Sequence, residues 1–126
     1  TTLFRSISIV NTLREELGMP VTIKWPNDIY VGDQKLSGIL IENTIMDSQL
    51  DKAIVGVGLN VNQQIFTSDA PNPVSMYQLR SKTFDRDSLL KNLINKSYRL
   101  ARTRLFYRQK KDACTMQTSI IPQKLC

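Results

Sequence analysis

A stretch of strand-forming residues near the start of the chain, interrupted twice, constrains the fold more than any other feature. Pro26 removes a ladder donor, and Gly32-Asp33 favours a tight reversal. The pattern predicts strand structure over 21–25 and 29–31, as one kinked strand or two short ones. It also predicts that 29–31 pairs with 35–42 as an antiparallel hairpin.

Amphipathic helices are predicted before and after the strands in the sequence. Apolar residues recur at spacings of three or four over 3–17 and again over 85–107. Gly18 suits the left-handed position at the end of the first helix, and Asp85 is a favourable N-cap for the second. A shorter helix is expected over 74–79. The helices should pack on the sheet.

The remaining segments complete the expected architecture. Residues 43–51 read as a polar loop, 52–62 as a further strand and 63–73 as a loop. Residues 108–126 show no sustained periodicity, so an irregular, basic tail is expected. The predicted fold class is α/β (α+β), with a mixed, mainly antiparallel sheet of about four strands and helices on one side.

Composition narrows the possible chemistry. The 126 residues suffice for one small domain, and no apolar run approaches the length of a membrane span. The chain has no histidine, which excludes Ser-His-Asp and Cys-His catalysis and the common zinc sites. The two cysteines, Cys114 and Cys126, suggest neither a disulfide framework nor a metal cluster. A cytoplasmic location is the default expectation.

Charge is unevenly distributed along the chain. The balance is −3 up to Leu79 and +9 from Arg80 onward, within a net charge of +6. A basic C-terminal third could meet an acidic partner or nucleic acid. One solvated helix face is the favoured interpretation, and nucleic acid is the less favoured partner because few aromatic residues are interleaved with the basic ones.

Three linked blocks of sequence carry a resemblance to a known family. They are Lys-Trp-Pro-Asn-Asp at 24–28, Lys-Leu-Ser-Gly-Ile-Leu-Ile-Glu at 35–42 and Gly-Val-Gly-Leu-Asn-Val-Asn at 56–62. In order and spacing they resemble the catalytic domain of biotin–protein ligases, from about Leu3 to about Leu105. Taken without the resemblance, the first block reads as an edge strand followed by a turn.

The resemblance implies a two-step reaction that needs ATP, Mg²⁺ and biotin. The biotin carboxylate attacks the α-phosphate of ATP to give biotinyl-5′-adenylate and pyrophosphate. A lysine amine of a biotin carboxyl carrier protein then attacks the mixed anhydride. The implied fold is related to that of class II aminoacyl-tRNA synthetases. A lipoate-type ligase is the enzyme alternative, and a non-catalytic binding fragment is the other.

Candidate catalytic residues lie in the first block. The resemblance assigns to Lys24 the cation between the biotin carboxylate and the α-phosphate, where an ammonium offsets their repulsion. Asp28, with Asn27, is expected to serve the nucleotide or its Mg²⁺, although both also suit a turn. Lys35 follows the hairpin turn and could reach phosphate or stay exposed.

Candidate binding residues lie in all three blocks. Gly38, Ile39 and Leu40 are expected to line the biotin pocket, because a strand glycine allows a flat group to approach the backbone. Trp25 is expected either to wall the nucleotide or, preferably, to fill the core. Asn60 matches an asparagine that lies near the nucleotide in the family.

The chain also departs from the family pattern. The family's Gly/Arg-rich loop and the polar residues that hold the biotin head group belong upstream of these blocks, and the sequence begins at Thr1. Residues 1–107 are therefore expected to form a partial, N-terminally truncated catalytic domain with weak or no ligase activity by itself. The small barrel-like domain that usually follows is not evident in 108–126. A homodimer is left open.

Overall fold

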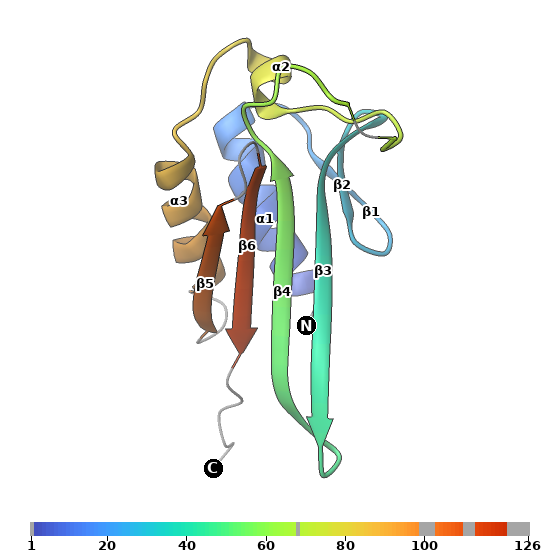
Figure 1. The fold of residues 1–126 in the computed structure, drawn as a ribbon, viewed down its shortest axis with the longest axis vertical. Helices are drawn as coiled ribbons and strands as arrows, with labels where there is room; N and C mark the ends of the chain where they lie inside the picture. The colour runs from blue at the N-terminus through green and yellow to red at the C-terminus, as the bar shows by residue number, and fades with distance from the viewer. Residues whose placement is uncertain (1, 68, 99–102, 110–112, 121–126) are drawn as a thin grey trace.

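The computed structural model describes residues 2–67, 69–98, 103–109 and 113–120 (Figure 1). These ranges contain three helices and six strands. The elements are α1 (Thr2–Leu17), β1 (Thr22–Lys24), β2 (Asp28–Val31), β3 (Gln34–Met46), β4 (Gln49–Asn60), α2 (Met76–Arg80), α3 (Arg86–Tyr98), β5 (Thr103–Gln109) and β6 (Ala113–Ile120). None of the helices in these ranges is long and apolar enough to cross a membrane.

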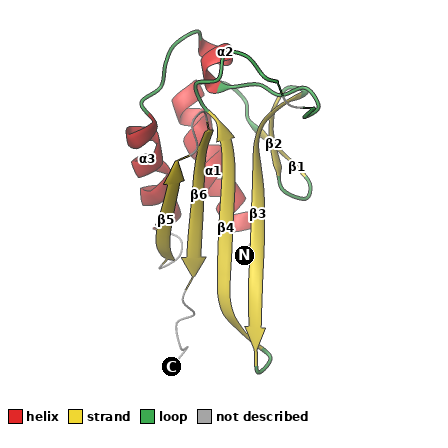
Figure 2. Ribbon diagram, in the orientation of Figure 1, coloured by secondary structure: helices red, strands yellow, loops and turns green. Residues whose placement is uncertain are grey.

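The strands form a single sheet in the order β1-β2-β3-β4-β6-β5 (Figure 2). Every pair of neighbouring strands is antiparallel. The expected α/β fold with a mainly antiparallel sheet is therefore confirmed, as is the pairing of 29–31 with the strand after Gly32. The residues on either side of Pro26 form two short strands that pair with each other, not one kinked strand.

The β3–β4 hairpin corrects one prediction. Residues 43–51 were expected to form a polar loop, but they continue both strands and reverse only at Asp47 and Ser48. Both residues have positive φ, at 50° and 63°, which is the backbone of a type I′ hairpin turn. The polar residues of this segment stay in the strands because cross-strand backbone pairing does not depend on side-chain hydropathy.

The core lies between the sheet and the two longer helices. In Figure 1, α1 and α3 lie behind the sheet, and no helix of the described ranges covers its front. Leu13 and Leu17 of α1 are buried, and so are Val55, Val57 and Leu59 of β4. Because successive strand residues point to opposite faces, this alternation shows that one face of β4 packs on the helices and the other is open.

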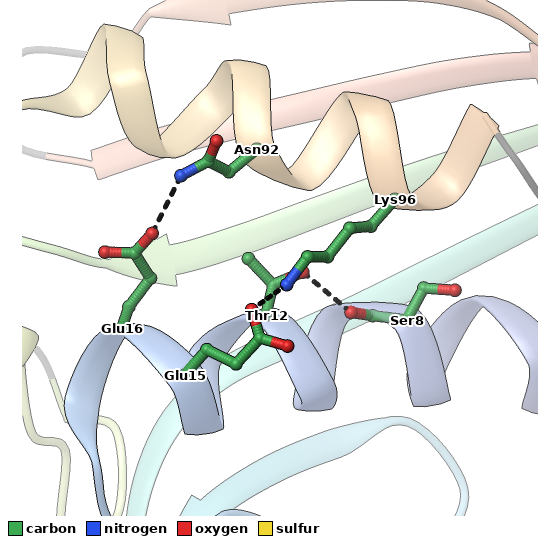
Figure 3. Close-up of polar contacts among 6 residues, drawn as sticks. All are labelled: Ser8, Thr12, Glu15, Glu16, Asn92 and Lys96. Atoms are coloured by element: carbon green, nitrogen blue, oxygen red, sulfur yellow. Dashed lines mark hydrogen bonds and ion pairs between the residues drawn. The ribbon is translucent and has the colours of Figure 1, made fainter.

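Polar side chains join the two helices above this core (Figure 3). Asn92 Nδ2 of α3 donates to Glu16 Oε1 of α1 at 2.8 Å, and Lys96 forms an ion pair with Glu15. Thr12 Oγ1 is buried but donates to the carbonyl oxygen of Ser8 at 2.9 Å. The exposed pairs add little free energy individually, so the apolar contacts below them dominate the packing of α1 on α3.

Two arginines donate hydrogen bonds to backbone carbonyl groups at and after the C-terminal end of α1. Gly18 has a φ of +62°, as its position after the helix predicts. Arg80 Nε donates to the Leu17 carbonyl oxygen, and Arg14 Nε and Nη2 donate to the Val21 carbonyl oxygen at 3.0 and 2.8 Å. These bonds satisfy carbonyl groups where the chain leaves the helix for β1.

The end of α3 is the second correction. The helix begins at Arg86, after the predicted cap, but it ends at Tyr98 and not near Tyr107. Residues 103–109 form β5, and 113–120, expected to be irregular, form β6. β6 pairs with the edge of β4 from Ala53 to Asn60. Pairing with an available strand edge outweighs the weak helical periodicity of this segment.

The N-cap of α3 gives a pH-dependent prediction. The hydrogen bond that Ser88 Oγ donates to Asp85 Oδ2 at 2.6 Å, supported by the Asp87 N–H, holds the pKa of Asp85 below its ordinary value. The resulting stability is present above the pKa of an unfolded aspartate, about 3.9, and is lost as the pH falls through the lower folded value. Asp85→Ala should therefore lower the thermal unfolding midpoint at pH 7, and by less at pH 3.

Asp85→Asn is the matched control for this cap. Asparagine caps helices about as well as aspartate but does not titrate in this range. It should keep most of the midpoint at pH 7 and remove this group's pH dependence. Equal midpoints for the wild type and Asp85→Ala at pH 7 would show that the cap does not stabilise α3.

Candidate functional site

A transverse row of residues crosses the first four strands on the open face of the sheet. Lys24 pairs with Asp28, Asp28 with Gly38 and Gly38 with Gly58. Residues paired across an antiparallel ladder project to the same face. The neighbouring Val57 is buried against the helices, so the row lies on the opposite, open face. The structure thus brings Lys24, Asp28 and Gly38 together, from two of the three sequence blocks, and adds Gly58 from the third.

The turn between β1 and β2 shapes one end of this row. The Trp25–Pro26 peptide bond is cis, and the Asn27 carbonyl oxygen accepts a hydrogen bond from Ile39 N at 2.8 Å. The Trp25 side chain is 88% exposed, so the expectation that it fills the core is wrong. It lies in the turn between β1 and β2.

Two of the charged side chains at this end of the row form an ion pair, and the third contacts an aromatic ring. Lys35 Nζ lies 2.9 Å from Asp28 Oδ1, and both side chains are about 30% exposed. Lys24 Nζ lies 5.0 Å from the centroid of the Tyr30 ring. Among the described residues, Lys24 has no carboxylate partner. One positive charge is therefore left uncompensated at this end of the open face.

Three glycines leave the backbone bare next to these charges. We call Gly38, Gly56 and Gly58 the glycine surface. A Cβ at Gly58 would lie 3.9 Å from the Gly38 carbonyl oxygen, and one at Gly56 would lie 3.8 Å from that of Leu40. Those are ordinary contacts, so the packing of the described chain does not itself require glycine here. Leu40, paired with Gly56 and 59% exposed, adds an apolar side chain on the same face.

Two other predicted residues, Ile39 and Asn60, are engaged in the fold itself. The Ile39 side chain is only 2% exposed and faces the helices, so it does not line a site on the open face. Residues 38–40 were expected to line the biotin pocket together, but consecutive strand residues alternate between faces. Asn60 lies at the end of β4, where its Nδ2 donates to the Val74 carbonyl oxygen at 3.2 Å and its Oδ1 accepts from Gln63 Nε2 at 3.4 Å. Asn60 therefore holds the loop that leads to α2.

Two further residues, one between the first two blocks and one in the third, had no predicted role. Tyr30 contacts Lys24, and the two-residue alternation from Asp28 could have placed it on the same face. Asn62 forms two hydrogen bonds with the backbone of Phe84, one from its Nδ2 and one to its Oδ1, both 2.9 Å long. No local sequence signal indicates the Asn62 contact, because its partner is 22 residues away.

The site could hold magnesium only if the nucleotide phosphates supplied further ligands to the ion. Within the described ranges no cluster of three or more histidine, cysteine or acidic residues could hold an ion. Mg²⁺ typically takes one or two carboxylates and completes its shell with phosphate oxygens and water. Asp28 suits that pattern, since its ion pair with Lys35 engages one of its two carboxylate oxygens, Oδ1.

Sequence comparisons with known proteins show which family the chain resembles. The profile of the Biotin/lipoate A/B protein ligase family matches residues 2–60. The bifunctional ligase/repressor BirA of Bacillus subtilis (strain 168) is 32% identical over 98 residues, covering 74% of this chain and 30% of BirA. BirA of Escherichia coli (strain K12) is 38% identical over 55 residues, covering 44% of this chain and 17% of that protein.

Solved structures show the same fold. The apo biotin protein ligase of Aquifex aeolicus superposes with a TM-score of 0.66 at 32% identity, covering 77% of this chain and 42% of that one. The same enzyme in complex with biotin and ATP gives 0.65 at 29% identity, covering 78% and 40%. The chain belongs to the Biotin/lipoate A/B protein ligase family. Within that family it carries the catalytic-domain fold of the biotin protein ligases, and it spans less than half the length of these relatives.

Proposed function

We propose that this chain acts in the ATP-dependent attachment of biotin to a lysine of a biotin carboxyl carrier protein, through biotinyl-5′-adenylate. The observation that carries the proposal is the Lys24 ammonium, which lacks a carboxylate partner among the described residues and lies in one row with the glycine surface. The related Aquifex aeolicus ligase is known in complex with biotin and ATP, which supports the same two substrates here.

The proposed first step joins two anions. A biotin carboxylate oxygen attacks the α-phosphorus of ATP, the bond to the bridging oxygen breaks, and its electron pair leaves with pyrophosphate. Lys24 would lower the repulsion between the carboxylate and the phosphate and stabilise the negative charge that accumulates on the phosphoryl oxygens. In the second step the carrier lysine amine attacks the acyl carbon, AMP leaves, and the amine loses a proton.

The row also suggests how the two substrates would be arranged. The glycine surface and Leu40 offer a flat, partly apolar area for the fused rings of biotin. In the row Asp28 lies between Lys24 and Gly38, next to Asn27, and both would bind the nucleotide, with Asp28 sharing Mg²⁺ with the phosphates. Lys35 can reach phosphate only by leaving Asp28.

Pyrophosphate exchange tests this proposal. Biotin-dependent exchange of pyrophosphate into ATP should be measurable but much slower for the 126-residue polypeptide than for full-length BirA of Bacillus subtilis, because the polypeptide spans 30% of that protein. A rate equal to that of the longer enzyme would contradict the need for the remaining part. Absence of both exchange and calorimetric binding of biotinyl-adenylate would overturn the proposal.

A lipoate-type ligase is the alternative within the same family, whose description covers both activities. Calorimetry with biotinyl- and lipoyl-adenylate separates the two, and tighter binding of lipoyl-adenylate would favour the alternative. A nucleic-acid surface on α3 is less well supported, because Lys96 of that helix is already paired with Glu15 of α1.

A further inference from the structure

The β1–β2 hairpin surrounds Lys24 with two possible partners. Asp28 lies directly opposite in the ladder, and Tyr30, which pairs with Thr22, lies diagonally across it. Direct cross-strand neighbours have the shorter separation, so a lysine opposite an aspartate would ordinarily form an ion pair. The structure shows the diagonal contact instead.

Lys35 already forms an ion pair with Asp28, through one of the two carboxylate oxygens. Its Nζ lies 2.9 Å from Asp28 Oδ1. Its backbone is held on both sides by the loop before α2, since Lys35 N donates to the Asn72 carbonyl oxygen and its own carbonyl oxygen accepts from Val74 N, both at 2.9 Å. Lys35 is thus anchored where its side chain can neutralise Asp28.

The Tyr30 ring binds Lys24 without neutralising it. The ammonium lies 5.0 Å from the ring centroid, within the range of a cation–π interaction. A carboxylate would cancel the positive charge, whereas the ring is uncharged and attracts the cation through its quadrupole. The side chain is therefore restrained while its full charge stays available to an incoming anion.

We propose that Tyr30 is a positioning residue for Lys24. Its ring holds the ammonium at the β1 end of the row, which continues through Asp28 to the glycine surface, and keeps it from Asp28 while an anionic carboxylate or phosphate binds. Tyr30 acts through Lys24 and does not touch the substrate. The identity of the anion rests on the proposed function, but the contact between Lys24 and Tyr30 does not.

The contact can be tested by NMR of the full chain with lysines labelled with ¹³C at Cε. A ring current from Tyr30 should shift the Lys24 ε-methylene protons upfield, with the signal assigned from a Lys24→Arg variant. Tyr30→Phe should keep the shift and Tyr30→Leu should remove it. Lys82, whose Nζ lies 5.0 Å from the Phe84 ring centroid, serves as the internal reference and should not change. If Tyr30→Leu does not fold, Tyr30→Val, a better strand former, replaces it.

Calorimetry with a non-hydrolysable biotinyl-adenylate analogue tests the consequence. Tyr30→Leu should weaken binding roughly two- to fivefold, and Tyr30→Phe should bind like the wild type. An unshifted Lys24 signal in the wild type, or equal affinity for Tyr30→Leu and the wild type, would overturn the inference. If the wild type binds no analogue but shows the upfield shift, the proposed function fails and the Lys24–Tyr30 contact stands.

Discussion

Replacing Gly58 with valine is expected to weaken binding of biotin and biotinyl-adenylate strongly while leaving the chain folded. Gly58 is exposed on the open face, and among the atoms that the structure describes a Cβ there would meet the Gly38 carbonyl oxygen first, at 3.9 Å. Valine favours strands, so the free energy of unfolding should stay equal or rise by about 0.5–1 kcal/mol. The added methyl groups would occupy the space that a flat ligand needs, and calorimetry should show affinity reduced by roughly two orders of magnitude or more.

Two further variants make this result specific. Gly58→Ala adds a single carbon and should reduce affinity by less than valine does. Ile54→Val changes a half-buried residue of the same strand, on the same face but four positions from Gly58, and should leave binding unchanged. Wild-type affinity in Gly58→Val, measured with the unfolding midpoint intact, would show that the glycine surface is not where the ligand lies.

Replacing Lys24 with methionine is expected to reduce affinity for biotinyl-adenylate by roughly 10- to 100-fold. Methionine keeps an unbranched side chain of similar length but removes the charge, and hydrogen bonds to charged groups contribute about 1.5–3 kcal/mol. The fold should be unaffected, because Lys24 is exposed and has no ion pair among the described residues. Calorimetry combined with thermal unfolding separates the two effects.

Lys91→Met is the matched control for the loss of charge. Lys91 is an exposed lysine of α3, on the side of the sheet away from the row, so its removal should leave affinity within about twofold of wild type, after screening by salt. Lys24→Arg keeps the charge with a different shape and should bind with intermediate affinity. If Lys24→Met and Lys91→Met weaken binding equally, only the net charge matters and Lys24 has no specific position.

The helices show how far local sequence determines structure. The stripe of apolar residues over 3–17 and the glycine after it predicted α1, because period and cap are both local properties. Asp85 likewise predicted where α3 begins. The end of α3 was not predictable in the same way, because β5 and β6 depend on the strand edge that β4 offers them.

The candidate site divides in a similar way. The three sequence blocks named Lys24, Asp28 and Gly38 as neighbours of a ligand, and the ladder places them in one row. They did not predict that Lys35 neutralises Asp28, or that Lys24 lies over Tyr30. Those contacts depend on side-chain geometry across a hairpin. They also depend on the loop around Asn72, which holds the Lys35 backbone by hydrogen bonds.

By itself, the sequence determined the pairing of 29–31 with the strand after Gly32, the first helix, the starting cap of α3 and the residues that carry the family resemblance. Each of these follows from turn-forming residues, from periodicity or from short motifs, which act over a few positions. Only the tertiary structure decided that Ile39 is buried, that Trp25 is exposed, and which cation Asp28 neutralises. These outcomes depend on which face the helices cover and on pairing between residues distant in the chain, where local preferences are too weak to decide.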